Sequence, residues 1–480
     1  MRQELLSVDN GKLKQDGSTV FDGLYLHLFN REIAGIICDD IQTKRRLNQF
    51  LVGEVTLDSG HLFIGEKKIS TEDSARLFPK ITVLINKKSE LVDSLTVEEN
   101  VFLFSDSAVF VNSKKYAIRF QALAEELDIH IATGQRPSEL AAGERILVEL
   151  MRAYVEKKRL VILDDVSGYL QRSEVETVFA VLTRLKQLNM TFLVGIGFED
   201  EYLQKIGRIT VMKNGRTISV IEPEKTDFQA YVRRLYFNEK TIRLSTKKKP
   251  GNLHRAYEQP ALEFRHVSSS VLKDIDFSVG QGELLKIHCY DDRSCSRLIA
   301  LLKGEDKPIS GGIFCAGAPY RAENVFSAVH HGVCFLEECS YDTMLFGNMS
   351  VVENLGIPCG EKIRHFWMFR RYSESIVKQL GKKFGTITAD TPVRNQKSNV
   401  LLQIAYYRWL LYYPKVIVCI NPFTDVDIYM REKAIDMIHQ YLERGIAVIL
   451  VTSNYYTADK FEGKTFHISN GSQVGGHDDL

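Results

Sequence analysis

The sequence has no excess of charge of either sign, and this absence excludes several classes of function. Its 62 lysines and arginines nearly cancel its 61 aspartates and glutamates, which gives a formal net charge of +1. A protein that binds nucleic acid or an anionic membrane through its overall field carries a clear basic excess. We therefore expect neither nucleic acid nor a lipid surface as a direct partner.

Long apolar runs and an organised set of cysteines are also missing. The most apolar region, 401–420, is broken by Arg408, Pro414 and Lys415, so we expect no membrane-spanning helix. The first residues lack the apolar core of a secretion signal, which favours a cytoplasmic protein. Seven of the eight cysteines lie in the second half, without the spacing of a disulfide framework or a zinc site. Reduced, buried thiols are the expectation.

What the chain does contain is a long internal repeat. The segment REIAGIICDDIQTKRRLNQFL at Arg31–Leu51 has an echo, GELLKIHCYDDRSCSRLIALL, at Gly282–Leu302. LTVEEN at 95–100 recurs as MSVVEN at 349–354. LVILDD, which ends at Asp165, is answered by VIVCIN, which ends at Asn421. A period of about 250 residues is far too long for a solenoid and indicates two fused copies of one domain.

Each copy alternates strand-like and helical segments, which is typical of an α/β fold with a mixed, largely parallel sheet. Asn214-Gly215 and Asn470-Gly471 predict a closing hairpin in each copy. Helix-rich inserts predict a helical subdomain in each copy. A polar segment with two prolines separates the copies. The predicted boundaries are a first domain at 1–245, a linker at 246–260 and a second domain at 261–480.

The order of these segments resembles the tandem ATP-binding subunit of bacterial ABC importers for monosaccharides, the ribose and galactose type. MSVVEN looks like the MSVxEN of that family, and RITVMKNG at Arg208–Gly215 resembles its RITVxxxG. The similarity covers nearly the whole chain. It implies two tandem ABC domains with a P-loop NTPase-like fold, which form an internal pseudo-dimer. It also implies permease subunits as partners at the inner face of the cell membrane.

The two phosphate loops depart from the family pattern GxxxxGK[ST]. That loop needs glycines so that backbone N–H groups surround phosphate oxygens, a lysine to neutralise them and a hydroxyl for Mg²⁺. The first loop reads CDDIQTKR at Cys38–Arg45, and the second reads CYDDRSCS with Cys295 at the lysine position. The remaining candidates for phosphate binding are Lys44, Arg45 and Arg46, at the start of a predicted helix. The alternative interpretation is a solvated basic helix start.

Walker B chemistry needs one carboxylate for the metal and one to polarise water. By resemblance Asp164 takes the metal and nucleotide position, and Asp165 replaces the usual glutamate as the candidate catalytic base. Ile420 and Asn421 replace both carboxylates in the second half. Candidate ligands for ATP and Mg²⁺ therefore remain in the first half only. The alternative is that the two aspartates are a residual family feature that caps the next segment.

The signature sequence and the docking region complete the set of candidate residues. The signature needs a serine and glycines at a helix N-terminus that faces the γ-phosphate. Its degenerate counterpart consists of Leu140, Ala141, Ala142 and Gly143, and in the second half Lys397, Ser398 and Asn399 take its place. The family's permease helices dock near the Q-loop position. In this chain that region includes Lys87, Leu95, Thr96 and Val97.

These substitutions lead to a prediction about function. The chain is expected to be a pseudo-ATPase associated with a carbohydrate import system, with ATP hydrolysis lost or very weak. One alternative is a functional ATP-binding subunit that energises sugar import through a divergent first site, supported by Lys44 and Asp164. Another is a cytosolic scaffold that is no longer tied to transport.

Overall fold

The computed structural model divides into two compact units, Met1–Arg243 and Leu244–Leu480, and each unit is described by itself. Most of the predicted linker lies outside the described residues. The described residues are 3–15, 18–103, 113–164, 170, 172–197, 201–225, 227–236, 259–338, 340–359, 392–396, 398–424, 426, 428–452, 461 and 463–474.

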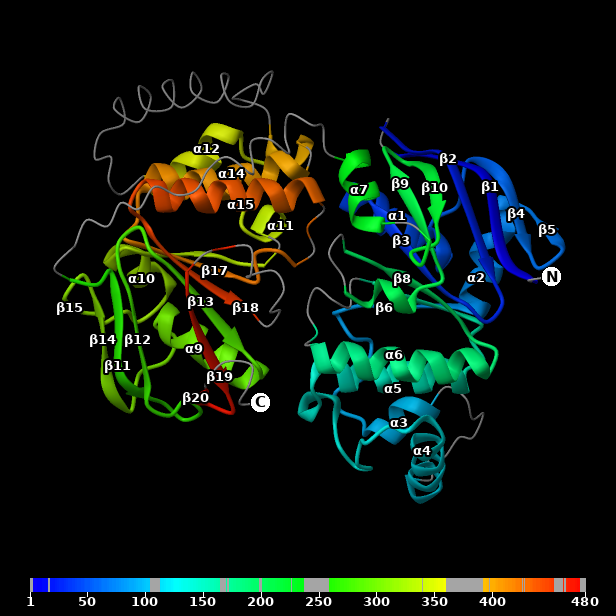
Figure 1. The fold of residues 1–480 in the computed structure, drawn as a ribbon, viewed down its shortest axis with the longest axis horizontal. Helices are drawn as coiled ribbons and strands as arrows, with labels where there is room; N and C mark the ends of the chain where they lie inside the picture. Colours follow the sequence, from blue (N-terminus) through cyan, green and yellow to red (C-terminus); the bar gives the residue numbers. More distant parts are fainter. Residues whose placement is uncertain are drawn as a thin grey trace. The chain divides into compact units, whose positions relative to one another are not determined.

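Among its described residues, unit 1 contains ten strands in two sheets (Figure 1). The strands are β1 (Glu4–Gln15), β2 (Ser18–Phe29), β3 (Ile33–Cys38), β4 (Ser59–Ile64), β5 (Lys67–Ile69), β6 (Thr82–Ile85), β7 (Leu160–Leu163), β8 (Thr191–Gly195), β9 (Arg208–Lys213) and β10 (Arg216–Ile221). One sheet is antiparallel, in the order β2-β1-β4-β5. The other has the order β10-β9-β3-β8-β7-β6, and all its pairs are parallel except β9–β10.

Helices flank the parallel sheet of unit 1. They are α1 (Ile41–Leu51), α2 (Thr71–Ile81), α3 (Val97–Phe102), α4 (Ser113–Leu127), α5 (Ala142–Val155), α6 (Arg172–Gln187) and α7 (Phe228–Tyr236), with 3-10 helices η1 (Pro137–Glu139) and η3 (Glu201–Lys205). Within this unit, α3 and α4 lie beyond α5, away from the sheet (Figure 1). They form the predicted helical subdomain. All four residues of β7 are buried, as expected for a central parallel strand covered on both faces.

Unit 2 repeats this arrangement. Its strands are β11 (Leu262–Ser268), β12 (Ile275–Val279), β13 (Leu284–Cys289), β14 (Ser310–Cys315), β15 (Ala318–Pro319), β16 (Val333–Leu336), β17 (Val416–Ile420), β18 (Ala447–Thr452), β19 (Lys464–Ser469) and β20 (Ser472–Val474). Its helices are α9 (Asp292–Lys303), α10 (Val325–His331), α11 (Ser340–Thr343), α12 (Val351–Gly356), α14 (Ser398–Tyr412) and α15 (Ile428–Glu443), with 3-10 helices η4 (Ile357–Cys359) and η5 (Val393–Asn395).

The sheets of the two units have the same topology. Sheet order β16-β17-β18-β13-β19-β20 in unit 2 is the order β6-β7-β8-β3-β9-β10 of unit 1, strand for strand. In both units the last pair is an antiparallel hairpin, β9–β10 or β19–β20, which confirms the two predicted Asn-Gly turns. The predicted fold class, two tandem α/β domains with mixed and largely parallel sheets, is confirmed.

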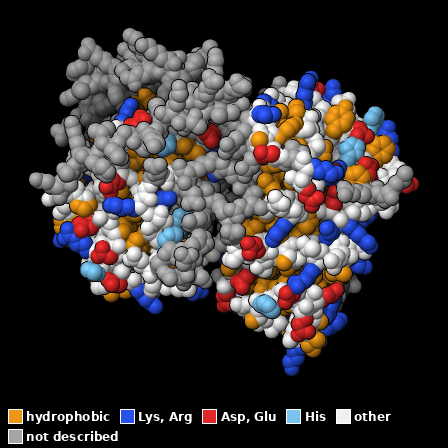
Figure 2. Space-filling view, viewed as in Figure 1, with side chains coloured by type: hydrophobic (Ala, Val, Ile, Leu, Met, Phe, Trp, Pro, Cys, Tyr) orange, Lys and Arg blue, Asp and Glu red, His pale blue; other side chains and the backbone are white. Residues whose placement is uncertain are grey.

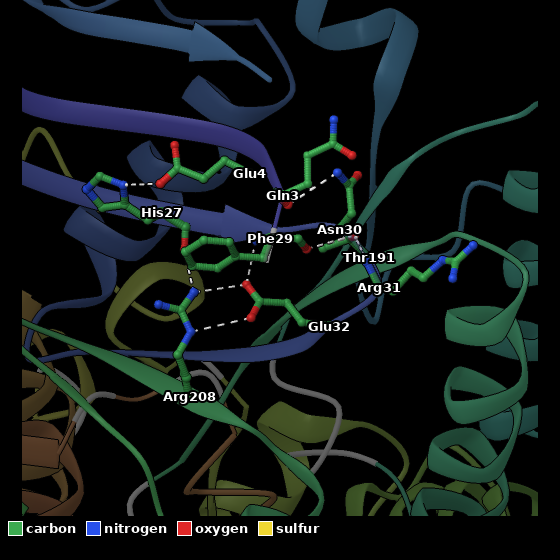
Figure 3. A network of polar contacts seen from close by, with 9 residues as sticks. All are labelled: Gln3, Glu4, His27, Phe29, Asn30, Arg31, Glu32, Thr191 and Arg208. Atoms are coloured by element: carbon green, nitrogen blue, oxygen red, sulfur yellow. Dashed lines mark hydrogen bonds and ion pairs between the residues drawn. The ribbon is translucent and has the colours of Figure 1, made fainter. Parts of the chain in front are cut away.

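The repeat extends to individual hydrogen bonds at the start of the parallel sheet. In unit 1, Glu32 accepts from the backbone N–H of Phe29 at 2.7 Å and from Arg208 at 3.0 Å. Figure 3 shows the Arg208 guanidinium facing both oxygens of this carboxylate. In unit 2, Glu283 accepts from the N–H of Gly280 at 2.9 Å and pairs with Lys464 at 3.3 Å. The equivalent carboxylate therefore joins the same two points of each unit.

The surface carries both signs of charge. On the face shown in Figure 2, lysines and arginines are interspersed with aspartates and glutamates over the described residues. No described helix combines the length and the apolar composition that a bilayer crossing requires. Five of the seven described cysteines are buried, and all seven are free thiols.

Candidate functional site

The connection between β3 and α1 occupies the place of a phosphate loop, and it is very short. Helix α1 begins at Ile41, so only Asp39 and Asp40 separate it from the strand. A phosphate loop keeps the equivalent residues as an open, amide-lined turn. Here the Asp40 carboxylate caps the helix, accepting from the backbone N–H of Thr43 at 2.8 Å and from its hydroxyl at 3.0 Å.

This helix starts earlier than the sequence suggested. The basic run was expected to begin the helix, whereas Lys44 is its fourth residue. The reason is local. Aspartate is among the best N-cap residues, and Ile41, Gln42 and Thr43 replace the glycine-containing end of the loop. Residues that would have surrounded a phosphate are therefore part of the helix.

Unit 2 has a connection of the same length, made of two different residues. Only Tyr290 and Asp291 separate β13 from α9. One oxygen of Asp291 accepts from the N–H of Ser294 at 2.8 Å, and the other accepts from the N–H of Asn470 at 2.8 Å. The Ser294 hydroxyl accepts from the N–H of Gly471 at 2.8 Å. One carboxylate thus caps the helix and holds the turn between β19 and β20.

In unit 1 two aspartates divide these tasks. Asp40 caps the helix, and both oxygens of Asp39 accept from the N–H of Asn214, each at 3.0 Å. Burial raises the pKa of the Asp39 carboxyl. Asn214 belongs to the turn between β9 and β10, which is the counterpart of the turn at Asn470. In both units, carboxylates of the chain itself hold the strand-to-helix connection against the last hairpin.

The remaining Walker residues of unit 1 meet each other. The Lys44 ammonium lies 2.9 Å from a carboxylate oxygen of Asp164, and both side chains are about five-sixths buried, at 17% and 16% exposure. This pair brings together two of the residues singled out in the sequence. Arg46 donates to Gln49 on its own helix at 2.7 Å. Arg45 is partly buried on the same helix, and Asp165 lies outside the described residues.

The corresponding strand end of unit 2 has no acidic residue at either Walker B position. Ile420 is buried at the end of β17, and Asn421 follows it with a left-handed backbone, φ 43°. The Asn421 N–H donates to the carbonyl of Val451 at 2.9 Å, which continues the pairing of the parallel strands by one residue. This end of unit 2 is built as part of the sheet.

The signature helix of unit 1 is also closed by carboxylates. Ala141 is the N-cap of α5, and Ala142 and Gly143 are its first residues, preceded by the buried Leu140. The Gly143 N–H donates to Glu174 of α6 at 3.0 Å, and the Ala141 N–H donates to Glu144 at 2.8 Å. A Cβ atom at position 143 would lie 2.9 Å from the Cβ of Glu174, so the close approach depends on glycine. In unit 2, α14 begins at Ser398, and Lys397 lies outside the described residues.

In the predicted docking region, unlike the strand-to-helix connections, the two units make the same hydrogen bonds. The buried side chain of Asn100 accepts from the N–H of Val92 at 2.8 Å and donates to the carbonyls of Val92, Leu95 and Thr96 at 3.1, 3.4 and 3.0 Å. Asn354 accepts from the N–H of Phe346 at 2.8 Å and donates to the carbonyls of Phe346, Met349 and Ser350 at 3.1, 3.4 and 3.0 Å. We call 92–96 and 346–350 the asparagine-held loops.

Each asparagine-held loop leads into a capped helix. Thr96 and Glu99 form a capping box at α3, and Ser350 and Glu353 form the same box at α12. Val97 is the first residue of α3 and is buried, whereas Lys87 is exposed between β6 and the loop. The structure therefore brings Leu95, Thr96 and Val97 together in one element. Lys87 precedes it on the same connection.

These geometries test whether ATP and Mg²⁺ fit the chain. A nucleoside triphosphate needs backbone amides without protein partners, and one amide at the start of each of α1, α5 and α9 already donates to a carboxylate, namely Asp40, Glu174 and Asp291. A carboxylate about 4 Å from a phosphate charge costs on the order of 4 kcal/mol near a protein surface. Among the described residues, no group of three or more histidine, cysteine or acidic side chains could hold a metal ion. At these three helix starts, carboxylates of the chain therefore occupy backbone donors that a nucleotide would use.

Sequence reasoning found the substituted motif positions but missed the residues that close them. Asp40 and Asp291 belong to the two loop sequences but were not among the candidate residues. Each lies three residues before a helical residue, Thr43 or Ser294, and this local N-cap signal could have identified them. Glu174 left no such signal. Its contact with Gly143 joins residues 31 positions apart, and no periodicity in the sequence marks it.

Comparisons with known proteins agree with this architecture. The family model described as ABC transporter matches residues 43–168, which start inside α1 and end just beyond β7. The ribose import ATP-binding protein RbsA of Bacillus licheniformis is 25% identical over 446 residues, covering 90% of this chain and 88% of the relative. The protein of the same name from Halalkalibacterium halodurans is 22% identical over 476 residues, covering 94% and 93%.

A solved ATP-binding cassette of an ABC transporter in its ADP conformation is 20% identical, with a TM-score of 0.42, and covers 51% of this chain and 99% of its own. The topology of the two units, the matched family model and the relatives that span both halves point to one conclusion. The chain is a tandem ABC-domain protein homologous to bacterial ribose import ATP-binding proteins.

Proposed function

We propose that this chain is a non-hydrolysing ABC subunit of a carbohydrate import system, which acts through its docking surfaces. The observation that carries the proposal is the closure of the nucleotide-binding ends by the protein's own carboxylates. Each of three carboxylates accepts a hydrogen bond from a backbone N–H that a phosphate oxygen would otherwise use, and these carboxylates belong to Asp40, Asp291 and Glu174. Replacing a bound nucleotide by internal carboxylates keeps the fold and removes the need for the ligand.

The loss of chemistry in unit 2 supports the same proposal. Cys295 on α9 stands where a lysine is required, and Ile420 and Asn421 at the end of β17 stand where two carboxylates are required. A general base and a metal ligand cannot be supplied by these side chains. In unit 1 the Lys44–Asp164 ion pair has each of its members already engaged by the other. Binding a nucleotide there requires breaking a partly buried ion pair and displacing Asp40.

The asparagine-held loops supply the part that is retained. Four hydrogen bonds from one buried amide fix each loop, and both loops keep the same set. Buried amides with complete hydrogen bonding define a single backbone conformation. We propose that Lys87, Leu95, Thr96 and Val97 form the docking surface of unit 1 for a permease subunit.

The partners and the cargo follow from the relatives. Their names describe ribose import. The resemblance to this type of importer implies permease subunits as partners. The chain would therefore sit at the inner face of the membrane through permease contacts, with unit boundaries near the proposed linker 246–260. A regulatory or assembly role in sugar import fits these features.

Phosphate release by the purified chain tests the proposal. The expected result is a rate with Mg²⁺ and ATP that equals the rate of the Lys44→Ala variant. Turnover by the wild type that disappears in Lys44→Ala, while Arg46→Ala keeps it, would contradict the proposal and favour a working first site. Arg46 is the matched control, because it is a basic residue of the same helix and donates to Gln49 on that helix.

A further inference from the structure

We propose that Cys289 and Cys295 of unit 2 form a redox-active dithiol, which a peroxide converts into an intramolecular disulfide. Both thiols are free in this structure, and they flank the strand-to-helix connection that takes the place of a phosphate loop. The inference goes beyond the proposed function and does not depend on it, because thiol oxidation requires neither a nucleotide nor a membrane partner.

The two cysteines belong to adjacent elements with fixed backbones. Cys289 is the last residue of β13, and Cys295 is the fourth residue of α9, which lies beside that strand (Figure 1). Every residue of β13 is buried, and the strand pairs with β18 on one side and β19 on the other. In the first turn of α9, the Cys295 N–H donates to the Asp291 carbonyl at 3.2 Å. Regular structure therefore fixes the backbone at both positions.

The two side chains meet at the edge of the core of unit 2. Cys289 belongs to the buried hydrophobic cluster of this unit, whereas Cys295 is partly exposed and packs against the same cluster. The Cys289 thiol is hydrogen-bonded to Cys295, and this bond, followed by burial, raises the pKa of the Cys289 thiol well above its usual value. Cys289 therefore stays a protonated thiol, and Cys295 is the sulfur that a small oxidant in solution reaches first.

This contact is the starting geometry for a disulfide. The bond requires sulfur atoms about 2.05 Å apart and a defined spacing of the two Cα atoms. Sulfur atoms that already share a hydrogen bond approach each other through small rotations of the two side chains. The resulting bond would span the connection made of Tyr290 and Asp291 and join the end of β13 to the first turn of α9.

Unit 1 lacks such a pair. The repeat places Cys38 and Lys44 at the equivalent positions, each 251 residues earlier in the chain. The Lys44 ammonium lies 2.9 Å from Asp164, and the Cys38 thiol donates to the sulfur of Met212 at 3.9 Å. The cysteine at the lysine position of unit 2 therefore removes a cation from the connection and places a second sulfur beside the first.

The oxidation balances with hydrogen peroxide as the oxidant. The thiolate of Cys295 attacks one peroxide oxygen, the O–O bond breaks, and the released hydroxide takes up the proton that the Cys295 thiol lost. The Cys289 sulfur then attacks the sulfur of the resulting sulfenic acid. The S–O bond breaks, and the hydroxyl group leaves as water with the proton of the Cys289 thiol. Two thiols lose two electrons and two protons in total, and one peroxide becomes two water molecules.

Peptide mapping tests the disulfide directly, because Arg293 lies between the two cysteines. Tryptic cleavage leaves one cysteine in IHCYDDR and the other in SCSR. The full chain is treated with hydrogen peroxide, the remaining thiols are alkylated, and the unreduced digest is analysed by mass spectrometry. The expected product is these two peptides joined by a disulfide, and dithiothreitol should separate them.

Matched variants distinguish this pair from the other thiols of the chain. Cys295→Ser, at a partly exposed position, should abolish the linked product while circular dichroism stays that of the wild type. Cys38→Ser, at the equivalent strand end of unit 1, should keep it. A disulfide from either cysteine to a different one, or a sulfinic acid at Cys295 without a disulfide, would overturn the proposal. Two unmodified thiols under conditions that fully oxidise glutathione would overturn it as well.

The redox equilibrium tests whether the fold brings the two sulfurs together. The full chain is equilibrated with mixtures of reduced and oxidised glutathione, in buffer and in urea, and the linked peptide is quantified. Because folding raises the effective concentration of one thiol at the other, the native pair should be half-oxidised at a value of [GSH]²/[GSSG] at least about tenfold higher than that of the unfolded chain. Equal values in buffer and in urea would overturn the proposal.

Discussion

The asparagine-held loops and the strand-to-helix connections behave in opposite ways between the two units. Asn100 and Asn354 make the same four hydrogen bonds, with donor–acceptor distances that agree to 0.1 Å. After β3 and β13, however, different residues cap the helix and hold the turn of the last hairpin. Two aspartates share the task in unit 1, and Asp291 alone performs it in unit 2.

This difference separates what the fold needs from what a ligand needs. A connection that no longer surrounds a phosphate can be rebuilt in several ways, provided that its amides find acceptors. Under the proposed function, a loop that presents a surface to another protein needs one backbone conformation, which the asparagine supplies. The proposal therefore rests more on the loops that agree between the units than on the connections that differ.

The two units also differ in the charge of the side chain that joins the segment after the edge strand, β6 or β16, to the helix that begins at the signature position. In unit 1 the buried carboxylate of Glu149 accepts from the Ser89 hydroxyl at 2.8 Å and from the N–H of Glu90 at 2.7 Å. In unit 2 the buried guanidinium of Arg408 donates to the carbonyl of Met344 at 2.6 Å. Both bonds join the segment after the edge strand to the helix that begins at the signature position.

The largest expected effect is the loss of an asparagine amide. Asn354→Ala removes four hydrogen bonds to buried backbone and should destabilise unit 2 by about 4 kcal/mol. Both tryptophans of the chain, Trp367 and Trp409, belong to unit 2, so fluorescence during urea unfolding reports this unit.

The matched variant for this measurement is Asn100→Ala. It should leave the urea midpoint of the fluorescence transition of unit 2 unchanged. It should lower the urea midpoint of the circular dichroism transition that belongs to unit 1. A loss of less than about 1 kcal/mol in Asn354→Ala would mean that the loop is held by other contacts.

Glu149 should make the stability of unit 1 sensitive to pH between pH 5 and pH 8. Burial raises its pKa from 4.5 to about 7, although the hydrogen bonds from Ser89 and Glu90 act in the other direction. Because the folded state then holds the proton more tightly, the protein gains stability as the pH falls through 7. The ionised carboxylate costs stability above that pH. Between pH 8 and pH 5 the gain should be about 2 to 3 kcal/mol.

Glu149→Gln removes this pH-dependent part of the free energy of unfolding, while the amide oxygen can still accept from the Ser89 hydroxyl and the Glu90 N–H. The variant should be more stable than the wild type at pH 8 and nearly equal to it at pH 5, as measured by urea unfolding. Glu126→Gln, at an exposed position on α4, is the control and should preserve the pH dependence. An identical pH dependence in wild type and Glu149→Gln would contradict the assignment.

A smaller effect distinguishes the two strand-to-helix connections. Asp291→Ala loses a helix cap and the bond to the last hairpin, and should cost about 2 kcal/mol. Asp40→Ala loses the cap alone and should cost about 1 kcal/mol. Asp292→Ala, at the exposed neighbouring position, should change the free energy of unfolding by less than about 0.5 kcal/mol. A larger loss from Asp40→Ala than from Asp291→Ala would reverse the comparison.

Much of this structure could be predicted from the sequence, because local signals determine it. Apolar strand-like segments, Asn-Gly turns and the internal repeat were sufficient to predict the two tandem α/β domains. The missing glycines in Cys38–Arg45 also predicted a damaged phosphate loop. The extension of α1 back to Ile41 was missed, since the capping role of Asp40 becomes clear only once the helix is placed.

Contacts between distant segments could not be predicted in this way. Three such features depend on how helices and turns pack in three dimensions. They are the hydrogen bond from the Gly143 N–H to Glu174, the hydrogen bond from the Asn470 N–H to Asp291, and the burial of Glu149. Each is a single polar side chain in an otherwise ordinary segment. Periodicity and composition do not indicate which of many acidic residues will meet a given amide.

Equilibrium binding of ATP with Mg²⁺ to the full chain, measured by calorimetry, tests the central claim most directly. The account predicts no saturable heat up to millimolar ATP, in the wild type and in Lys44→Ala alike. Micromolar binding that is abolished by Lys44→Ala would contradict it. That result would show that Asp40 yields to phosphate and that the first unit still works as a nucleotide site.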